Sequence, residues 1–138
     1  EATYPLRYTR YEFLADTGGA GQFRGGMGVA RDIQFLDQSG MLNTQFDKFK
    51  VAPFGLFGGA DGACGSLTLE RQGEVVNLAS KTVNQDLRKG DIISMQTQGG
   101  GGFGDPSKRD EQMVRRDLRE GKVSPQCAQQ NHGVGPKE

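Results

Sequence analysis

The stretch that decides the fold of this chain is residues 18–28, which read GGAGQFRGGMG. Two similar clusters follow, GLFGGADGACG at 55–65 and GGGGFGDP at 99–106, and the chain contains 22 glycines in all. A flexible linker mixes glycine with serine, whereas these clusters mix it with Phe, Met, Leu and Arg. Such large side chains need something to pack against, so we expect the three clusters to be ordered backbone.

Ordering glycine is costly, because glycine loses more conformational freedom on folding than any other residue. Extended segments of the polyproline II type can pack tightly side by side only where no Cβ lies between them, as at the axis of collagen. Collagen itself is excluded, since the Gly-X-Y repeat is absent and the chain has five prolines. We therefore expect the clusters to run as extended, polyproline II-like segments that pack on one another or on a partner.

The composition points to a domain with a thin core. The chain has 138 residues, which suits one domain, and 34% of them are hydrophobic. Globular domains reach about 45–50% when glycine is counted with the apolar residues, but glycine brings no side chain to a core. A chain of this kind is expected to depend on a partner for part of its stability.

The charges and cysteines exclude several classes of protein. The chain has 17 basic and 17 acidic residues and no basic patch with interleaved aromatic residues, so we expect no nucleic-acid partner. No apolar run approaches the ~20 residues of a membrane span, and no export signal is visible at the start. Cys64 and Cys127 are expected to be free thiols in a reducing, cytoplasmic environment.

Alternating apolar and polar residues predict six or seven short strands, and therefore a mainly β fold that is a small barrel or a two-sheet sandwich. The alternation slips at Arg10-Tyr11, which is typical of a bulge. The turns at 37–40 and at 72–73 each predict a hairpin. The expected strands are 6–14, 29–36, 41–49, 67–71, 74–78, 81–87 and 92–97.

The sequence becomes more polar after Pro106, and two short helices are expected in the last thirty residues. The first runs from Lys108 and is stopped by Gly121. Ser124 is a good N-cap for the second, which starts at Pro125 and ends before Gly133. We therefore divide the chain into a β-rich, glycine-cluster domain at 1–106 and a short helical extension at 107–138.

Few residues are suited to catalysis, and we expect no catalytic or cofactor-binding residue in this chain. His132 is the one histidine of the sequence. A zinc site formed by Cys64, Cys127 and His132 is an alternative, but no paired CxxC supports it, so two free thiols and a tail histidine are preferred. The glycine clusters break the G-x-G-x-x-G pattern and lack the Lys-Ser/Thr of a phosphate loop.

Two polar residues of the clusters are expected to have structural or contact roles. Arg24, flanked by glycines, can reach an anion or a partner carboxylate with its forked set of donors. Asp105 precedes Pro106 and is expected to be a turn or cap residue. The residues predicted to be structural or to lie at a subunit interface are Arg24, Gly25, Gly26, Gly58, Gly59, Gly99, Gly100, Gly101, Gly102 and Asp105.

Taken in order, these motifs resemble the C-terminal portion of the hydantoinase B/oxoprolinase/acetone carboxylase family. The resemblance covers the chain from about Leu6 onward. In most of that family this portion ends a much longer polypeptide, whose earlier part carries the metal-binding and catalytic groups. The motifs that carry it are GGAGQFRGGMGVAR at 18–31, PFGLFGG at 53–59, SK at 80–81, GD at 90–91, TQGGGGFGDP at 97–106, GKVS at 121–124 and GV at 133–134.

A separate chain of this length resembles the small subunit of the acetophenone carboxylases, a heteromeric group within the family. The resemblance implies an accessory subunit that completes a hydantoinase-B-like unit, with ATP and a divalent metal bound by larger hydantoinase A-like and B-like subunits. The implied reaction joins acetophenone and bicarbonate to give benzoylacetate at the expense of ATP. The alternatives are the C-terminal segment of a hydantoinase- or oxoprolinase-type amidohydrolase and a stand-alone β-rich binding module.

Overall fold

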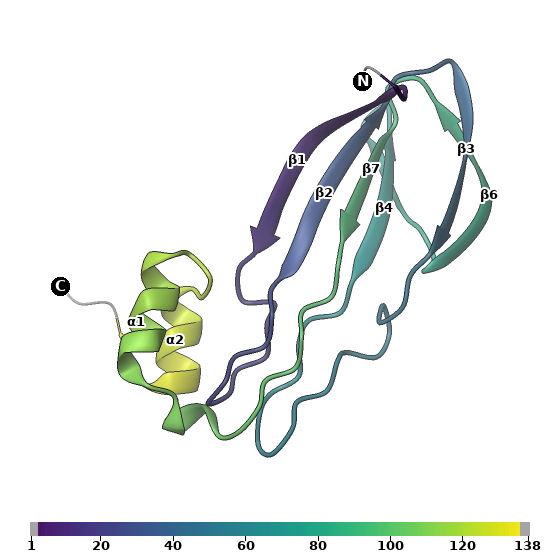
Figure 1. The fold of residues 1–138 in the computed structure, drawn as a ribbon. Helices are drawn as coiled ribbons and strands as arrows, with labels where there is room; N and C mark the ends of the chain where they lie inside the picture. The colour runs from purple at the N-terminus through teal and green to yellow at the C-terminus, as the bar shows by residue number, and fades with distance from the viewer. Residues whose placement is uncertain (1–2, 136–138) are drawn as a thin grey trace.

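A computed structural model describes residues 3–135 (Figure 1). Within them the chain forms seven strands, a 3-10 turn and two short helices, so the mainly β prediction is confirmed. The strands are β1 (Leu6–Leu14), β2 (Gly28–Phe35), β3 (Ser39–Gln45), β4 (Ser66–Arg71), β5 (Glu74–Asn77), β6 (Lys81–Arg88) and β7 (Ile92–Gln96). The helical elements are η1 (Pro106–Lys108), α1 (Glu111–Arg119) and α2 (Pro125–His132).

The strands form two antiparallel sheets, as expected for a two-sheet sandwich. A five-stranded sheet has the order β1-β2-β7-β4-β5, and β3 pairs with β6 in a second, two-stranded sheet. The hairpin predicted at 72–73 joins β4 to β5. Gln72 and Gly73 both have left-handed φ angles, of 52° and 84°, as a type I′ hairpin turn requires.

The hairpin predicted between β2 and β3 is wrong. Both edges of β2 are occupied, one by β1 and the other by β7, so β3 has no free edge to join. The turn at 37–40 instead carries the chain out of the first sheet, and β3 pairs with β6, which lies about forty residues later in the chain. The turn residues do mark a reversal of the chain, but the partner of β3 is set by this long-range pairing.

The two faces of the five-stranded sheet differ in chemistry. Leu67, Leu69 and Ile93 lie on the inner face, with no more than 5% of each residue exposed. The core also contains Phe35 of β2 and Leu87 of β6, so the second sheet packs against part of the inner face. The outer face has polar residues between these positions, as expected for a sheet with one face in contact with water.

A buried ion pair joins the end of β4 to the turn between β6 and β7. Asp91, which is 2% exposed, accepts hydrogen bonds from Nε and Nη2 of Arg71, the shorter at 2.6 Å. It also accepts one from the backbone N–H of Arg88 at 2.8 Å. The hydrogen bonds from the Arg71 guanidinium lower the pKa of Asp91 below its ordinary value, although burial opposes this.

The helices begin and end where the sequence predicts, with one exception. The hydroxyl of Ser124 accepts from the backbone N–H of Cys127, and Gly133 ends α2 in the left-handed conformation. The first helix is shorter than predicted, because Asp110 caps α1 and the preceding residues form η1. A small core that joins the two helices consists of Val114, Val123 and Ala128. Neither helix of residues 3–135 has the length and apolar character needed to cross a bilayer.

Candidate functional site

The three glycine clusters pack on one another between the sheets and the helices, as the long extended segments of Figure 1 show. The third cluster lies among the other two. Gly100 accepts a hydrogen bond from the N–H of Gly19 at 2.8 Å and donates one to Gly26 at 2.8 Å. Gly102 donates to Ala60 and accepts from Leu56. The clusters therefore satisfy one another's backbone groups without forming a regular ladder.

Close approach of backbones explains most of these glycines. Several could not carry a Cβ, because the added atom would lie within 2.2 Å of a backbone oxygen of a neighbouring segment; these are Gly19, Gly25, Gly55, Gly59, Gly99, Gly101 and Gly102. Three of the residues predicted to be structural differ, and for one of them, Gly100, the nearest atom to an added Cβ is the backbone nitrogen of Gly26 at 3.1 Å. A Cβ on Gly26 would meet no described atom within 4 Å, and Gly58 has room but a left-handed φ of 92°.

An exposed aromatic cluster stands on this glycine scaffold. The ring of Phe103 lies 6.3 Å from that of Phe23 and 5.1 Å from that of Phe57. All three residues are at least 45% exposed. Phe57 has a φ of 51°, an unfavourable backbone conformation for a non-glycine residue. The sequence places these aromatics beside the glycines, and the scaffold holds them at the surface.

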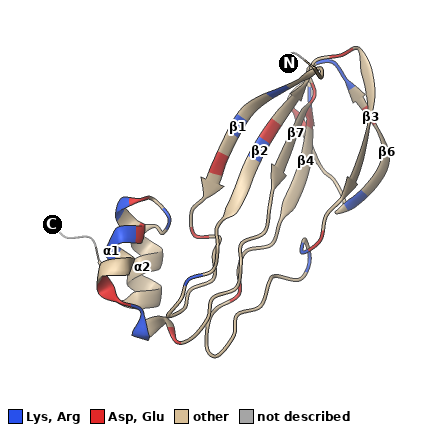
Figure 2. Cartoon of the chain, viewed as in Figure 1, with Lys and Arg blue, Asp and Glu red and all other residues tan. Residues whose placement is uncertain are grey.

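Arg24 is held at the junction of the first glycine cluster with the helices. Its Nε lies 3.1 Å from Oδ2 of Asp117 on α1, and its Nη1 donates to the backbone oxygen of Gly25. Nη2 of Arg109 contacts the same Asp117 oxygen at 2.8 Å. The side chains of Arg109 and Asp117 are 5% and 8% exposed. Figure 2 shows charged residues of both signs gathered on α1 and its flanks.

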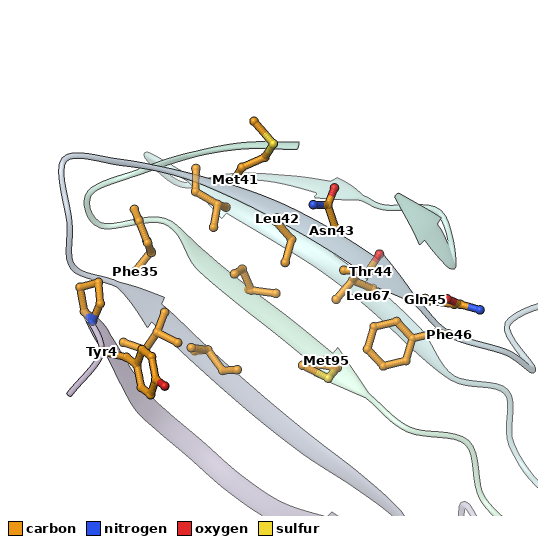
Figure 3. A pocket seen from close by; sticks show the side chains of 15 residues that line it. Tyr4, Phe35, Met41, Leu42, Asn43, Thr44, Gln45, Phe46, Leu67 and Met95 are labelled. Atoms are coloured by element: carbon orange, nitrogen blue, oxygen red, sulfur yellow. The ribbon is translucent and has the colours of Figure 1, made fainter. Parts of the chain in front are cut away.

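A large hollow lies between the two sheets (Figure 3). It has a volume of about 460 Å³ and an apolar lining. Figure 3 shows Phe35, Leu67 and Met95 of the larger sheet on one side and Leu42 and Phe46 on the other. The second sheet therefore covers the inner face of the first sheet only in part.

The uncovered part of that inner face continues along β1 as a row of aromatic residues. Tyr8 pairs with Ile33, a residue of the groove, and Tyr11 and Phe13 pair with Arg31 and Val29. Directly opposed residues share a face of a sheet, so this row extends the groove. Tyr8, Tyr11 and Phe13 are 58%, 64% and 69% exposed.

A bulge in β1 aligns this aromatic row. The register shifts between Tyr8 and Arg10, one step before the slip predicted at Arg10-Tyr11. Residues three apart in a regular strand point to opposite faces, and the extra residue restores Tyr8 and Tyr11 to one face. The two rings meet edge to face, with centroids 6.3 Å apart, and the guanidinium of Arg31 lies 5.0 Å from the Tyr11 ring centroid.

The remaining candidate residues lie apart or have structural contacts. Cys127 and His132 are on α2, whereas Cys64 is exposed in the second glycine cluster. Nδ1 of His132 lies 2.9 Å from the backbone oxygen of Pro106. Within residues 3–135, no three His, Cys, Asp or Glu side chains are grouped to hold a metal ion. Asp105 caps η1, where its carboxylate accepts from the N–H and hydroxyl of Ser107.

Two features of the site could not be found by sequence reasoning. Asp117, which pairs with Arg24, and Arg109, which shares that carboxylate, look in the sequence like part of a charged helix face. The fold brings Arg24 and Asp117 together across 93 residues, a pairing that one sequence does not contain. The apolar row on β1 was predicted as alternation, but which of its two faces would remain uncovered depends on the size of the second sheet.

Comparison with known proteins gives the family of the chain. Residues 1–106 match the family model described as hydantoinase B/oxoprolinase. The chain is 35% identical over 136 residues to a putative D-/L-hydantoinase subunit from Pseudomonas sp. strain NS671, a match that covers 97% of this chain and 23% of that protein. It is 30% identical over 142 residues to the beta subunit of caprolactamase from Pseudomonas jessenii, covering 97% and 24%. The chain thus spans about a quarter of the length of these relatives.

Solved structures share the fold. The crystal structure of the ATP-dependent caprolactamase from Pseudomonas jessenii matches with a TM-score of 0.82 and 26% identity, over 99% of this chain and 24% of that one. A nucleotide-free acetone carboxylase matches with a TM-score of 0.80 over 94% of this chain and 22% of that one, and at 21% identity this shows the fold alone. The family indicated by the sequence motifs is therefore confirmed: the chain belongs to the hydantoinase B/oxoprolinase family.

Proposed function

We propose that this chain is a non-catalytic, structural part of an ATP-dependent enzyme, in which it completes a hydantoinase-B-like unit. The observation that supports the proposal is the uncovered inner face of the five-stranded sheet. Its groove of about 460 Å³ continues into Tyr8, Tyr11 and Phe13, which stand on one face of β1 and are each more than half exposed. Large contiguous apolar patches of this kind mark contacts with other polypeptide segments.

The occupant that we propose for this face is the part of a hydantoinase-B-type polypeptide that lies outside the matched region. Most of each relative lies outside that region, since the match covers 23% of the hydantoinase protein and 24% of the caprolactamase protein. Burying an aromatic side chain contributes about 1.5–3 kcal/mol. Covering the row on β1 would therefore add several kcal/mol to the stability of the sheet.

The glycine clusters do not need this partner. They pack on one another and exchange hydrogen bonds within the chain, so their ordering is accounted for internally. The support for a partner comes instead from the sheet, whose apolar inner face is larger than the two-stranded sheet that covers it. This unequal covering also disfavours a stand-alone binding module, which would leave the aromatic row in water.

At the level of the reaction, we propose the acetophenone carboxylase type of complex, which the order of the motifs supports. Acetophenone and bicarbonate would give benzoylacetate, with ATP and a divalent metal bound by larger hydantoinase A-like and B-like subunits in the cytoplasm. The second candidate is an amidohydrolase of the hydantoinase or oxoprolinase type. It is favoured by the 35% identity to a protein described as part of a hydantoinase.

Purification from the native host tests both the proposed membership in a larger enzyme and the proposed reaction. The chain would carry a terminal affinity tag, and the co-purifying chains would be identified by mass. The complex would then be assayed for ATP-dependent incorporation of labelled bicarbonate into acetophenone and for ATP-dependent opening of hydantoin or 5-oxoproline. Carboxylation supports the first candidate and ring opening the second. Purification of the chain with no larger family member would refute the proposal that it is part of a larger enzyme.

Hydrogen exchange of the same complex tests the proposed face. Amides of β1 and of the groove should exchange more slowly in the complex than in the separate chain. The matched control is β5, at the opposite edge of the sheet, where Val75 and Val76 are also more than half exposed but line no part of the groove. Unchanged protection of β1 in an intact complex would show that the partner binds elsewhere.

A further inference from the structure

A second hollow is lined by residues of the first glycine cluster, of α1 and of the segments that flank α1. These elements lie at the opposite end of the molecule from β3 and β6 (Figure 1). Its volume is about 300 Å³. Four basic side chains, one acid and two apolar side chains line it: Arg24, Arg109, Arg116 and Lys122, then Asp117, then Phe23 and Met113. The position differs from that of the proposed contact face, and the chemistry is cationic where the other is apolar.

The lining carries more positive charge than the fold neutralises. Arg24 and Arg109 share one carboxylate oxygen of Asp117, so this buried group retains one positive charge. Arg116 and Lys122 likewise share the carboxylate of Glu120, which is 2.7 Å from Arg116. The three guanidiniums and one ammonium of the lining thus share two carboxylates, and a hollow lined in this way attracts anions.

The buried arginine also has unused donor capacity. Nη1 of Arg109 donates to the backbone oxygen of Gln22 at 3.0 Å, and its Nη2 contacts Asp117. Its Nε is buried and has no acceptor among residues 3–135. A buried donor without a partner is costly, and its presence in a folded protein needs an explanation such as an ordered water or a bound ion.

The apolar part of the lining defines the rest of the ligand. Phe23 and Met113 are 59% and 46% exposed, and both line the hollow beside the cationic groups. We propose that this hollow binds a carboxylate whose attached body is apolar or aromatic. The carboxylate would lie against the arginines, which bind it through paired donors, and the apolar body against Phe23 and Met113. The same chemistry is offered by a free organic acid and by an acidic side chain of a partner polypeptide.

Benzoate and benzamide are the probes that test the proposal on the full chain. The two have the same shape, but only benzoate is charged. Arginine side-chain Nε–H resonances and backbone amides near Arg24 and Arg109 would be followed by NMR during titration. Benzoate should shift them in a saturable manner, with benzamide binding at least tenfold more weakly. Equal binding of the two probes, or no saturable shift with benzoate, would overturn the proposal.

Matched double variants distinguish binding in the hollow from attraction to the net charge of the chain. Arg116→Gln with Lys122→Gln removes two charges from the rim of the hollow and should weaken benzoate binding at least tenfold. Arg115→Gln with Arg119→Gln removes two charges from α1 at positions outside the lining and should change binding less than twofold. Circular dichroism would check that both variants keep the parent fold. An equal loss in the two variants would show attraction to net charge alone.

The source of the carboxylate is decided by repeating the titration on the assembled complex. Benzoate binding to both forms would identify a site for a free organic acid. Benzoate binding to the separate chain but not to the complex would show that a partner's carboxylate fills the hollow. Both results support a carboxylate site, and neither depends on the reaction that the complex catalyses. The proposal would be refuted if the complex bound benzoate and the pocket variant did so equally well.

Discussion

Two adjacent glycines provide a sharp test of the packed glycine clusters. An alanine Cβ on Gly25 would lie 2.0 Å from the backbone oxygen of Gly100, whereas a Cβ on Gly26 would meet no described atom within 4 Å. Neither position is among the left-handed glycines of the chain. Gly25→Ala and Gly26→Ala are therefore the same chemical change, made one residue apart, with and without a backbone clash.

The contact between the added Cβ of Gly25→Ala and the backbone of Gly100 sets the expected difference in stability between the two variants. Ordinary Cβ contacts begin near 3.4 Å, so in Gly25→Ala the segments must separate by about 1.4 Å. The hydrogen bond from Gly19 to Gly100 and the one from Gly100 to Gly26 are both 2.8 Å long and would be lost. Their loss costs about 1 kcal/mol each, and strain adds about 1–3 kcal/mol. Gly26→Ala should instead stabilise the chain by about 0.5 kcal/mol, because it restricts the unfolded state.

Urea unfolding followed by circular dichroism measures this difference. With an m-value of about 2 kcal/mol/M, a gap of about 3.5–5.5 kcal/mol places the midpoint of Gly25→Ala about 1.8–2.8 M below that of Gly26→Ala. If Gly25→Ala fails to fold while Gly26→Ala unfolds like the parent, the predicted order of stability is still confirmed. Equal midpoints for the two variants would refute the idea that backbone contact fixes these glycines.

Three further outcomes are expected. Asp117→Ala should destabilise the chain by about 3–5 kcal/mol, because the guanidiniums of Arg24 and Arg109 then lose their shared carboxylate. Arg24→Ala should destabilise it less, since the contact between Arg109 and Asp117 remains. Unfolding of the two single variants and the double variant checks this order of stability. Since the folded pKa of Asp91 is lowered, its contribution is complete above about pH 4 and disappears as the pH falls through the folded pKa, so Asp91→Asn should flatten the acid limb of a stability–pH curve. Calorimetry with ATP and magnesium should give no one-site isotherm for the separate chain, since no phosphate loop opens a helix.

Local patterns predicted the elements of this fold well. The alternation at 6–14 gave β1 with its bounds, and Ser124, Pro125 and Gly133 predicted both ends of α2. These features depend on side chains within a few residues of one another. The packing of the glycine clusters was also predicted, because a run of residues without a Cβ indicates that another backbone segment lies close by.

The parts that were missed depend on distant partners. The pairing of β3 with β6 joins Ser39 to Arg88, and no local turn residue could indicate it. The contact of Arg24 with a carboxylate was expected, but its partner proved to be Asp117 of the same chain. Since Arg24 already has a carboxylate partner within the chain, the expectation that it contacts another subunit now rests on the excess positive charge of the hollow that it lines.

The arrangement of the two hollows suggests what the ordered glycines contribute. The apolar groove lies at the sheet end of the molecule and the cationic hollow at the helical end, with the glycine segments between them (Figure 1). A flexible tether would let these two surfaces move independently, and each would then bind at its own entropic cost. Hydrogen bonds of Gly100 with Gly19 and Gly26, and of Gly102 with Leu56 and Ala60, hold the segments together instead. A partner that contacts both ends would therefore meet surfaces already fixed at one separation, which lowers the entropy lost on assembly.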